Sequence, residues 1–289
     1  MIEIEFLLAP FVACLILTGI HAYLGIHVIE RKVIFVDLSL AQIAALGTSF
    51  GFLIGFEYGS TTSYFISLSF AFVGAAIFSL TRSRNERVPQ EAIIGIVYAV
   101  SAAAFVLIMD RAPEGAEKIK GMMLGSILYV NWQDIIKTGI LYALIGLFHF
   151  VYRHKFIMIS QNPGKAFDEG IHVKFWDFLF YISFGFVVTS SVAIAGVLQV
   201  FSYLVVPSVI AVLFSNQLKI RLWIGWSAGV LASLIGIIAS LAFDMPTGAA
   251  IVCTFGVLLI LSGLAHILMR KPQQVKIVSD EEFSVSKHS

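Results

Sequence analysis

The sequence predicts an all-α, polytopic membrane protein with about eight or nine transmembrane helices. Of its 289 residues, 58% are hydrophobic and only 13% are charged, and the mean hydropathy is +0.91. Soluble domains are about 45–50% apolar and about 25% charged, so a chain of this length could not hide so much apolar surface from water. Several apolar runs also reach the roughly 20 residues that cross about 30 Å of hydrocarbon. These observations place the chain in a lipid bilayer.

Nine apolar runs, each bounded by polar or charged residues, are the candidate spans. The stretch 176–215 is nearly continuous, so it could hold two spans or one broken helix, and the helix count depends on it. The expected spans are 5–29, 38–56, 62–81, 92–110, 134–152, 176–195, 197–215, 222–243 and 249–269.

Lysine and arginine gather in alternate connections between these spans. The basic connections are Arg31–Lys32, TRSRNER (81–87), the segment from YRHK (152–155) to Lys174, KIR (219–221) and RKPQQVK (270–276). Basic connections stay in the cytoplasm, so we expect the N-terminus outside the inner membrane of a bacterium and the C-terminus inside. Residues 1–270 then form the membrane domain, and residues 271–289 form a polar cytoplasmic tail.

The chain carries no recognisable enzyme signature. It lacks H-E-x-x-H, G-x-S-x-G and the cysteine–histidine spacings of zinc sites. NPGKAFDEG contains Gly-Lys but neither the upstream glycine nor the hydroxyl residue of a phosphate loop. We therefore expect no ATP hydrolysis by this chain, no bound cofactor and no nucleic-acid partner.

The second span combines small residues with polar ones. Gly47, Gly51 and Gly55 recur every four residues, which predicts a ridge that lets another helix approach closely. Asp37 and Gln42 in the same span are therefore expected to face the interior, where a carboxylate is expensive and often functional. Alternatively, Asp37 pairs with Arg31 or Lys32 at the membrane edge, and Gln42 is an interhelical hydrogen-bond anchor.

Histidines and a glutamate mark the first span. His27 and Glu30 are three residues apart and so are neighbours on a helix. Such a pair can bind a divalent metal, as can His21 one and a half turns earlier. The alternative for the pair is a single hydrogen bond near the membrane interface.

The connection after the fifth span contains a short predicted helix, at about 161–172. Asn162 can cap it, Pro163 suits its first turn and Gly170 can end it. An amphipathic helix of mixed charge on a cytoplasmic face is a docking element rather than a catalytic one.

These pieces together resemble the ABC-3 permeases, the membrane subunits of bacterial zinc and manganese uptake systems. The family's basic pair and MSLLGDALSHAALPGVALGFLLG align without a gap on residues 31–55 and share Arg31–Lys32 and the three glycines. Similar motifs follow in the same order. They are EAIIGIVYAVSAAAFVLI (91–108), MLGSILYV (123–130), NPGKAFDEGIHV (162–173), AGVLQVFSYLVVPSVIAVLF (195–214) and SLAFDMPTGAAIV (240–252).

One departure concerns the family's aspartate and histidine, which lie four apart on one helix face. They fall on Leu38 and Gln42 here, and Asp37 stands where the family has glycine. A shift of one position turns a side chain by about 100°, so Asp37 cannot simply replace the aspartate. Gln42 keeps an oxygen ligand without charge, which weakens any preference for zinc.

The resemblance implies the permease bundle of an importer for a divalent metal, zinc or manganese, or iron. It implies a cytoplasmic ABC ATPase dimer, an external metal-binding protein and a second permease copy as partners. We assign the translocation path to His21, His27, Asp37, Gln42 and Glu91. ATPase coupling is assigned to Asn162, Pro163, Ala166, Gly170 and Ile171. A secondary carrier and a scaffold subunit without transport remain the alternatives.

Overall fold

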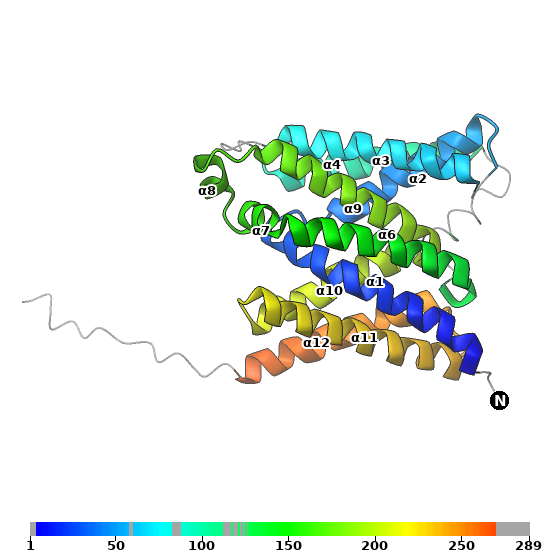
Figure 1. The fold of residues 1–289 in the computed structure, drawn as a ribbon. Coiled ribbons are helices and arrows are strands. Elements are labelled where there is room, and N and C mark those ends of the chain that lie inside the picture. Colours follow the sequence, from blue (N-terminus) through cyan, green and yellow to red (C-terminus); the bar gives the residue numbers. More distant parts are fainter. Residues whose placement is uncertain are drawn as a thin grey trace, which may run out of the picture.

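The computed structural model describes residues 4–57, 60–82, 88–111, 117, 121, 123, 125 and 127–269. Every regular element within these residues is helical, which confirms the predicted fold class (Figure 1). The helices are α1 (Ile4–Glu30), α2 (Val36–Leu53), α3 (Thr61–Thr81), α4 (Gln90–Met109), η1 (Ile127–Tyr129), α6 (Trp132–Val151), α7 (Arg153–Gln161), α8 (Pro163–Asp168), α9 (Val173–Ala195), α10 (Val197–Phe214), α11 (Leu218–Ala242) and α12 (Thr247–Met269).

Nine helices of the described part are long and apolar enough to cross a membrane. They are α1 to α4, α6 and α9 to α12, and each matches one expected span. The largest difference in a boundary is four residues, at the start of α11, where 222 was expected and Leu218 is observed. The described N-terminal end lies at the opposite end of the bundle from α8 and from the end of α12 (Figure 1).

The nearly continuous stretch 176–215 forms two helices that meet at Gly196. This residue has φ of 77°, a left-handed conformation that glycine adopts without a steric penalty. Its N–H still donates to the Val192 carbonyl oxygen (2.9 Å), and its carbonyl oxygen already accepts from the Val200 N–H (3.1 Å). One residue therefore ends α9 and begins α10 without a loop.

The helices pack in two groups, which contact each other through α9 and α10. In one group α2 packs against α3 and α4, and α9 packs against α3. In the other, α1 packs against α10 and α11, and α12 packs against α10 and α11. Gly25 of α1 permits this second group to close, because a Cβ there would lie 2.0 Å from the Leu204 carbonyl oxygen of α10.

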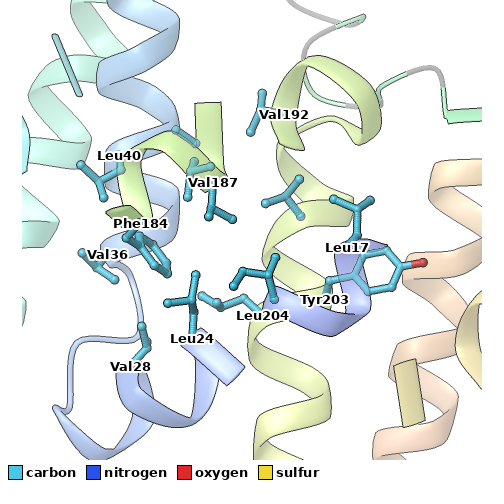
Figure 2. Close-up of a cluster of buried hydrophobic side chains, with 14 of the residues drawn as sticks. Leu17, Leu24, Val28, Val36, Leu40, Phe184, Val187, Val192, Tyr203 and Leu204 are labelled. Carbon is cyan, nitrogen blue, oxygen red and sulfur yellow. The ribbon is translucent and has the colours of Figure 1, made fainter. Parts of the chain in front are cut away.

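A buried hydrophobic cluster joins the two groups. Figure 2 shows side chains of α1, α2, α9 and α10 meeting in it, with Leu24 of α1 and Phe184 of α9 near its centre. The labelled residues are Leu17, Leu24, Val28, Val36, Leu40, Phe184, Val187, Val192, Tyr203 and Leu204. This cluster joins α1 and α10 to α2 and α9.

Two features differ from the sequence-based prediction. The second span ends at Leu53 rather than at residue 56, and Gly55 lies beyond the helix with φ of 95°. In addition, α7 precedes α8 as a separate helix, because its Phe156, Ile159 and Ser160 are buried although the segment is basic. The predicted tail 271–289 and most of the connection 112–126 lie outside the described residues.

Candidate functional site

Asp37 lies in the first turn of α2 and is 1% exposed. Its Oδ1 has no hydrogen-bond partner among the described residues. The expected alternative of a pair with Arg31 is wrong, because Arg31 binds Asp177 instead. No ion pair between Asp37 and Lys32 occurs in this part of the chain either. The positive end of the α2 dipole is the only compensation that the described structure offers this carboxylate.

Glu91 approaches the same end of α2 from the first turn of α4. Its Oε1 accepts a hydrogen bond from the Phe35 backbone N–H (3.0 Å), at the residue that precedes α2. Its Oε2 is buried and has no hydrogen-bond partner among the described residues. Asp37 and Glu91 thus each present one buried oxygen without a partner at the beginning of α2. Such oxygens cost free energy unless a donor or a cation satisfies them.

Gln42 is also buried in α2, but it does not share a face with Asp37. The two residues are five positions apart, which corresponds to a rotation of about 140° around the helix. The glycine ridge of α2 is only partly as predicted. A Cβ at Gly47 would lie 2.9 Å from Ser67 Cα of α3, and Gly51 also faces α3, whereas Gly55 contacts nothing.

His21 lies on α1 and is held by hydrogen bonds at both ring nitrogens. Nδ1 donates to the Leu17 carbonyl oxygen (2.8 Å), and Nε2 is 3.2 Å from the Ser191 Oγ of α9. With both ring nitrogens engaged, His21 joins α1 to α9 and has no nitrogen left for a metal in this conformation.

His27 and Glu30 do not form the pair that their spacing suggests. His27 Nδ1 is 2.8 Å from the Ser160 Oγ of α7, and Glu30 forms an ion pair with Arg221 of α11. His27 Nε2 is buried and has no hydrogen-bond partner in the described structure. Among the histidine nitrogens assigned to the translocation path, this is the one left free to take a ligand.

The structure does not bring all five assigned metal residues together. His21 and His27 lie on α1, which packs mainly on α10, α11 and α6, whereas α2 packs on α3, α4 and α9. Among the described residues, no group of three or more His, Cys, Asp or Glu side chains could hold a metal ion. The two carboxylates at the start of α2 therefore form the most promising partial site.

A buried ion-pair network lies nearby and was not recognised in the sequence. Asp177 of α9 binds Arg31 through Oδ1 and Arg82 through Oδ2, the latter at 3.1 Å from Nε. The Arg31 guanidinium also lies 4.0 Å above the centre of the Phe180 ring. Asp177 could have been noticed as the one carboxylate inside the apolar run KFWDFLFYI, since such groups need a partner in a membrane.

A cavity of about 450 Å³ opens beside this network. Its wall includes the cations Arg31, Lys32 and Arg82, the carboxylates of Glu30 and Glu91, and residues of α8. The cavity thus connects the α8 surface with the Glu91 end of the partial site.

The residues assigned to coupling form the short helix α8 and its ends. Asn162 is the N-cap, and its Oδ1 accepts from the Lys165 N–H (3.1 Å), while Pro163 occupies the first position. Ala166 is fully buried, and its carbonyl oxygen accepts from the Ile171 N–H (3.0 Å). Gly170 reverses the chain with φ of 73°. Gly164, Lys165 and Glu169 face outward, so α8 presents an exposed, charged surface.

Comparison with known proteins gives one family across nearly the whole chain. The ABC 3 transport family matches residues 3–266. The manganese transport system membrane protein MntC of Listeria monocytogenes is 26% identical over 67% of this chain and 71% of its own length. The manganese import system permease protein ScaB of Streptococcus parasanguinis is 21% identical over 90% of each chain.

A solved structure shares the fold. It is described as PsaBC from Streptococcus pneumoniae in complex with Fab, and it superposes with a TM-score of 0.75. The match covers 90% of this chain and 91% of that chain, at 20% sequence identity. At this identity, the likeness extends to the fold alone.

Proposed function

Because the chain belongs to the ABC 3 transport family, we propose that it is the membrane-spanning permease of an ATP-driven importer for a divalent metal cation. Manganese is the first choice, because MntC and ScaB are both named for manganese transport. Zinc and iron are the alternatives. The observation that carries the proposal within this chain is that Asp37, which is buried, and Glu91, which is half-buried, each have one buried oxygen without a hydrogen-bond partner among the described residues.

Two carboxylates suit a hard divalent cation during passage. Oxygen ligands favour manganese, whereas zinc prefers sites with imidazole or thiolate. Gln42 adds a neutral amide oxygen deeper in α2, where the related permeases have a histidine. His21 has a lesser role in this proposal, because Leu17 and Ser191 occupy its nitrogens. His27 keeps Nε2 available and could act only after the cation has left α2.

The proposed partners follow from the surfaces that the chain presents. A cytoplasmic ABC ATPase dimer would dock on α8, where Lys165 and Glu169 are exposed. An external binding protein would deliver the metal at the opposite end of the bundle. A second copy of the chain is proposed because the described residues hold fewer than three clustered metal ligands. A second copy, or a helix movement, would supply the remaining ligands.

The proposed location is the inner membrane of a bacterium, with α8 on the cytoplasmic side. Single cysteines test this orientation in a background in which Cys14 and Cys253, both free thiols, are replaced by alanine. Gly164→Cys should react with a membrane-impermeant maleimide only after cells are opened. Glu57→Cys, in the exposed connection after α2, should react in intact spheroplasts. The reverse labelling would place α8 outside and remove it as an ATPase dock.

The deciding experiment uses the assembled complex in liposomes. The complex is captured through a tag on this chain, its subunits are identified, and uptake of manganese, zinc and iron is measured with and without ATP. We expect metal uptake that requires ATP and a co-purifying ATPase. Glu91→Gln keeps an oxygen for the Phe35 N–H but removes the charge, and it should lower uptake without loss of assembly.

The same experiment separates the competing functions. Uptake by the chain alone, driven by an ion gradient instead of ATP, would identify a secondary carrier. Assembly with an ATPase but no uptake of any of the three metals would favour a scaffold subunit. Either result would overturn the proposal.

A further inference from the structure

The Ser160 hydroxyl group of α7 connects α7 and α8 to α1, and its proton and both lone pairs are engaged in hydrogen bonds. Ser160 lies two residues before Asn162, the N-cap of α8. Its Oγ donates to the Phe156 carbonyl oxygen (2.8 Å) and accepts from Arg31 Nε (2.8 Å). A hydroxyl has one proton and two lone pairs, so His27 Nδ1, also at 2.8 Å, must be the second donor.

Arg31 extends this connection to the other helices. Arg31 directly follows the end of α1, four residues after His27, and binds the Asp177 carboxylate of α9. The same carboxylate also binds Arg82, which follows the end of α3. The side chains of Arg31 and Asp177 are 0% exposed and that of Arg82 is 6% exposed. Little solvent reaches these ion pairs, so salt and water screen them weakly. The ends of α1, α3, α7 and α9 are thereby held as one unit.

Gln90 continues the connection to the partial metal site. Its Nε2 donates to the Tyr181 hydroxyl of α9 (3.2 Å) and to the Phe78 carbonyl oxygen of α3 (2.9 Å). Tyr181 lies one turn after Asp177, and Phe78 lies one turn before Arg82. The adjacent residue on α4, Glu91, accepts from the Phe35 N–H at the start of α2. Asp37 follows Phe35 by two residues in the first turn of α2.

We propose that these contacts form a mechanical link from α8 to the two carboxylates of the partial site. The proposal rests on the proposed function. The members of the link are Ser160, Arg31, Asp177, Tyr181, Gln90, Glu91 and Phe35. Movement of α7 and α8 by the ATPase shifts Ser160, and Arg31 and Asp177 pass the shift to α9. Gln90 then moves the first turn of α4, which carries Glu91 and the beginning of α2. Ser160 and Gln90 are positioning residues in this scheme, because neither touches the metal.

The contacts from Ser160 to Gln90 are buried, and they branch to α3 at Arg82 and Phe78, whereas the last contact, between Glu91 and Phe35, is exposed. Hydrogen bonds and ion pairs have discrete geometries, so a displaced residue breaks its contact or carries its partner with it. Each connection in the link joins a different pair of elements, in the order α7–α1, α1–α9, α9–α4 and α4–α2. If each contact only stabilised its own pair of helices, the contacts would not have to follow one another from α7 to α2.

The test compares Ser160→Ala with Ser183→Ala in the complete transporter in liposomes. Ser183 of α9 is the matched control, because it is also buried, donates to a helix carbonyl oxygen and contacts a histidine, His149, at 2.8 Å. The measured quantity is the number of manganese ions taken up per ATP hydrolysed. The ratio is measured on complexes whose assembly has been verified, because an ATPase that has dissociated would hydrolyse ATP without uptake and lower the ratio.

Ser160→Ala should lower the ratio of manganese ions to ATP at least about fivefold, which is the lower end of typical coupling between sites. The rate of ATP hydrolysis should stay within about twofold of that of the unmodified complex. Ser183→Ala should leave the ratio unchanged. Gln90→Leu, at the other end of the link, should lower the ratio as Ser160→Ala does. The double variant should then be no worse than the more affected single variant, since both substitutions interrupt one link.

Three outcomes would overturn the inference. The first is an unchanged ratio in Ser160→Ala, and the second is an equal loss in Ser183→Ala. The third is a double variant whose loss is the product of the two single losses. If Ser160→Ala does not assemble, Gln90→Leu decides by the same ratio. An unmodified complex that transports no metal would instead overturn the proposed function itself.

Discussion

Two buried aspartates near the α8 end of the bundle stand in opposite environments. Asp177 of α9 binds two arginines, one at each carboxylate oxygen, and is closed off from solvent. Asp37 of α2 is 1% exposed and has an oxygen without a partner among the described residues. Both carboxylates are costly to bury, but only the first is compensated by opposite charge. The difference separates a carboxylate that holds helices together from one that is available to a passing cation.

The surroundings of each aspartate support this distinction. Asp177 gathers cations from the ends of two other helices, and its removal would leave two guanidinium groups buried together. Glu91, a second carboxylate with an oxygen that has no hydrogen-bond partner among the described residues, accepts from the N–H of Phe35, two residues before Asp37. A buried carboxylate oxygen that no donor satisfies is suited to a divalent cation, because the cation offsets the cost of leaving that oxygen without a partner.

The largest expected effect comes from removing the charge of the paired aspartate. Asp177→Asn should lower the free energy of unfolding by about 3–5 kcal/mol, because it leaves an uncompensated buried charge. Thermal unfolding of the purified protein in detergent measures this loss. Asp244→Asn, the same change at an exposed position, is the control and should have little effect. An unchanged melting temperature in Asp177→Asn would show that the ion pairs do not stabilise the bundle.

The unpaired aspartate should respond in the opposite way. Asp37→Asn removes a buried charge that nothing neutralises, so stability should stay equal or rise. Manganese uptake should fall about tenfold or more, equivalent to about 1.4 kcal/mol. Ser39→Ala is the control, because it also removes a buried polar atom without a partner from the same turn of α2. Normal uptake by Asp37→Asn, or an equal loss in Ser39→Ala, would make Asp37 a packing residue.

Gln42 allows a smaller change, in selectivity rather than in total uptake. Gln42→His introduces the imidazole that the motif of the resembling family has at this position of α2. Imidazole suits zinc better than an amide oxygen does, so the ratio of zinc to manganese uptake should rise. Gln42→Leu, which supplies no ligand, should not raise that ratio. Identical ratios in all three proteins would place Gln42 outside the translocation path.

An exposed carboxylate provides the smallest expected effect. Glu169 lies 3.7 Å from Lys165 on the surface of α8, and both side chains are largely open to solvent. Exposed pairs of this kind contribute about 0–1 kcal/mol, so Glu169→Gln should leave the melting temperature nearly unchanged. Together with Asp177→Asn, this variant separates the effect of burial from the effect of charge. A loss as large as that of Asp177→Asn would contradict the distinction.

Most residues of the partial site could be identified from the sequence, but the contacts between them and the other helices could not. Asp37, Gln42 and Glu91 were identified as polar groups in or beside apolar spans. The alternative that paired Asp37 with Arg31 was wrong. It arose because Asp37 is close to Arg31 in sequence, whereas the observed partner, Asp177, is 146 residues away. Ser160 and Gln90 attracted no attention, since a single serine or glutamine near the end of a span has many neutral explanations. Their importance depends on contacts with helices that are distant in sequence.

The amino-acid sequence by itself predicted a membrane location, eight or nine spans and a short helix at about 161–172, which the structure places at Pro163–Asp168. These features depend on local composition: apolar length decides a span, and Asn162, Pro163 and Gly170 decide a short helix with defined ends. The tertiary structure alone decided which buried charges are compensated. Compensation requires that groups from α1, α3 and α9 meet within a few ångströms, and no local pattern reports that distance. For the same reason, only the fold separated Asp177, which forms ion pairs with two arginines, from Asp37, which forms none with a described residue.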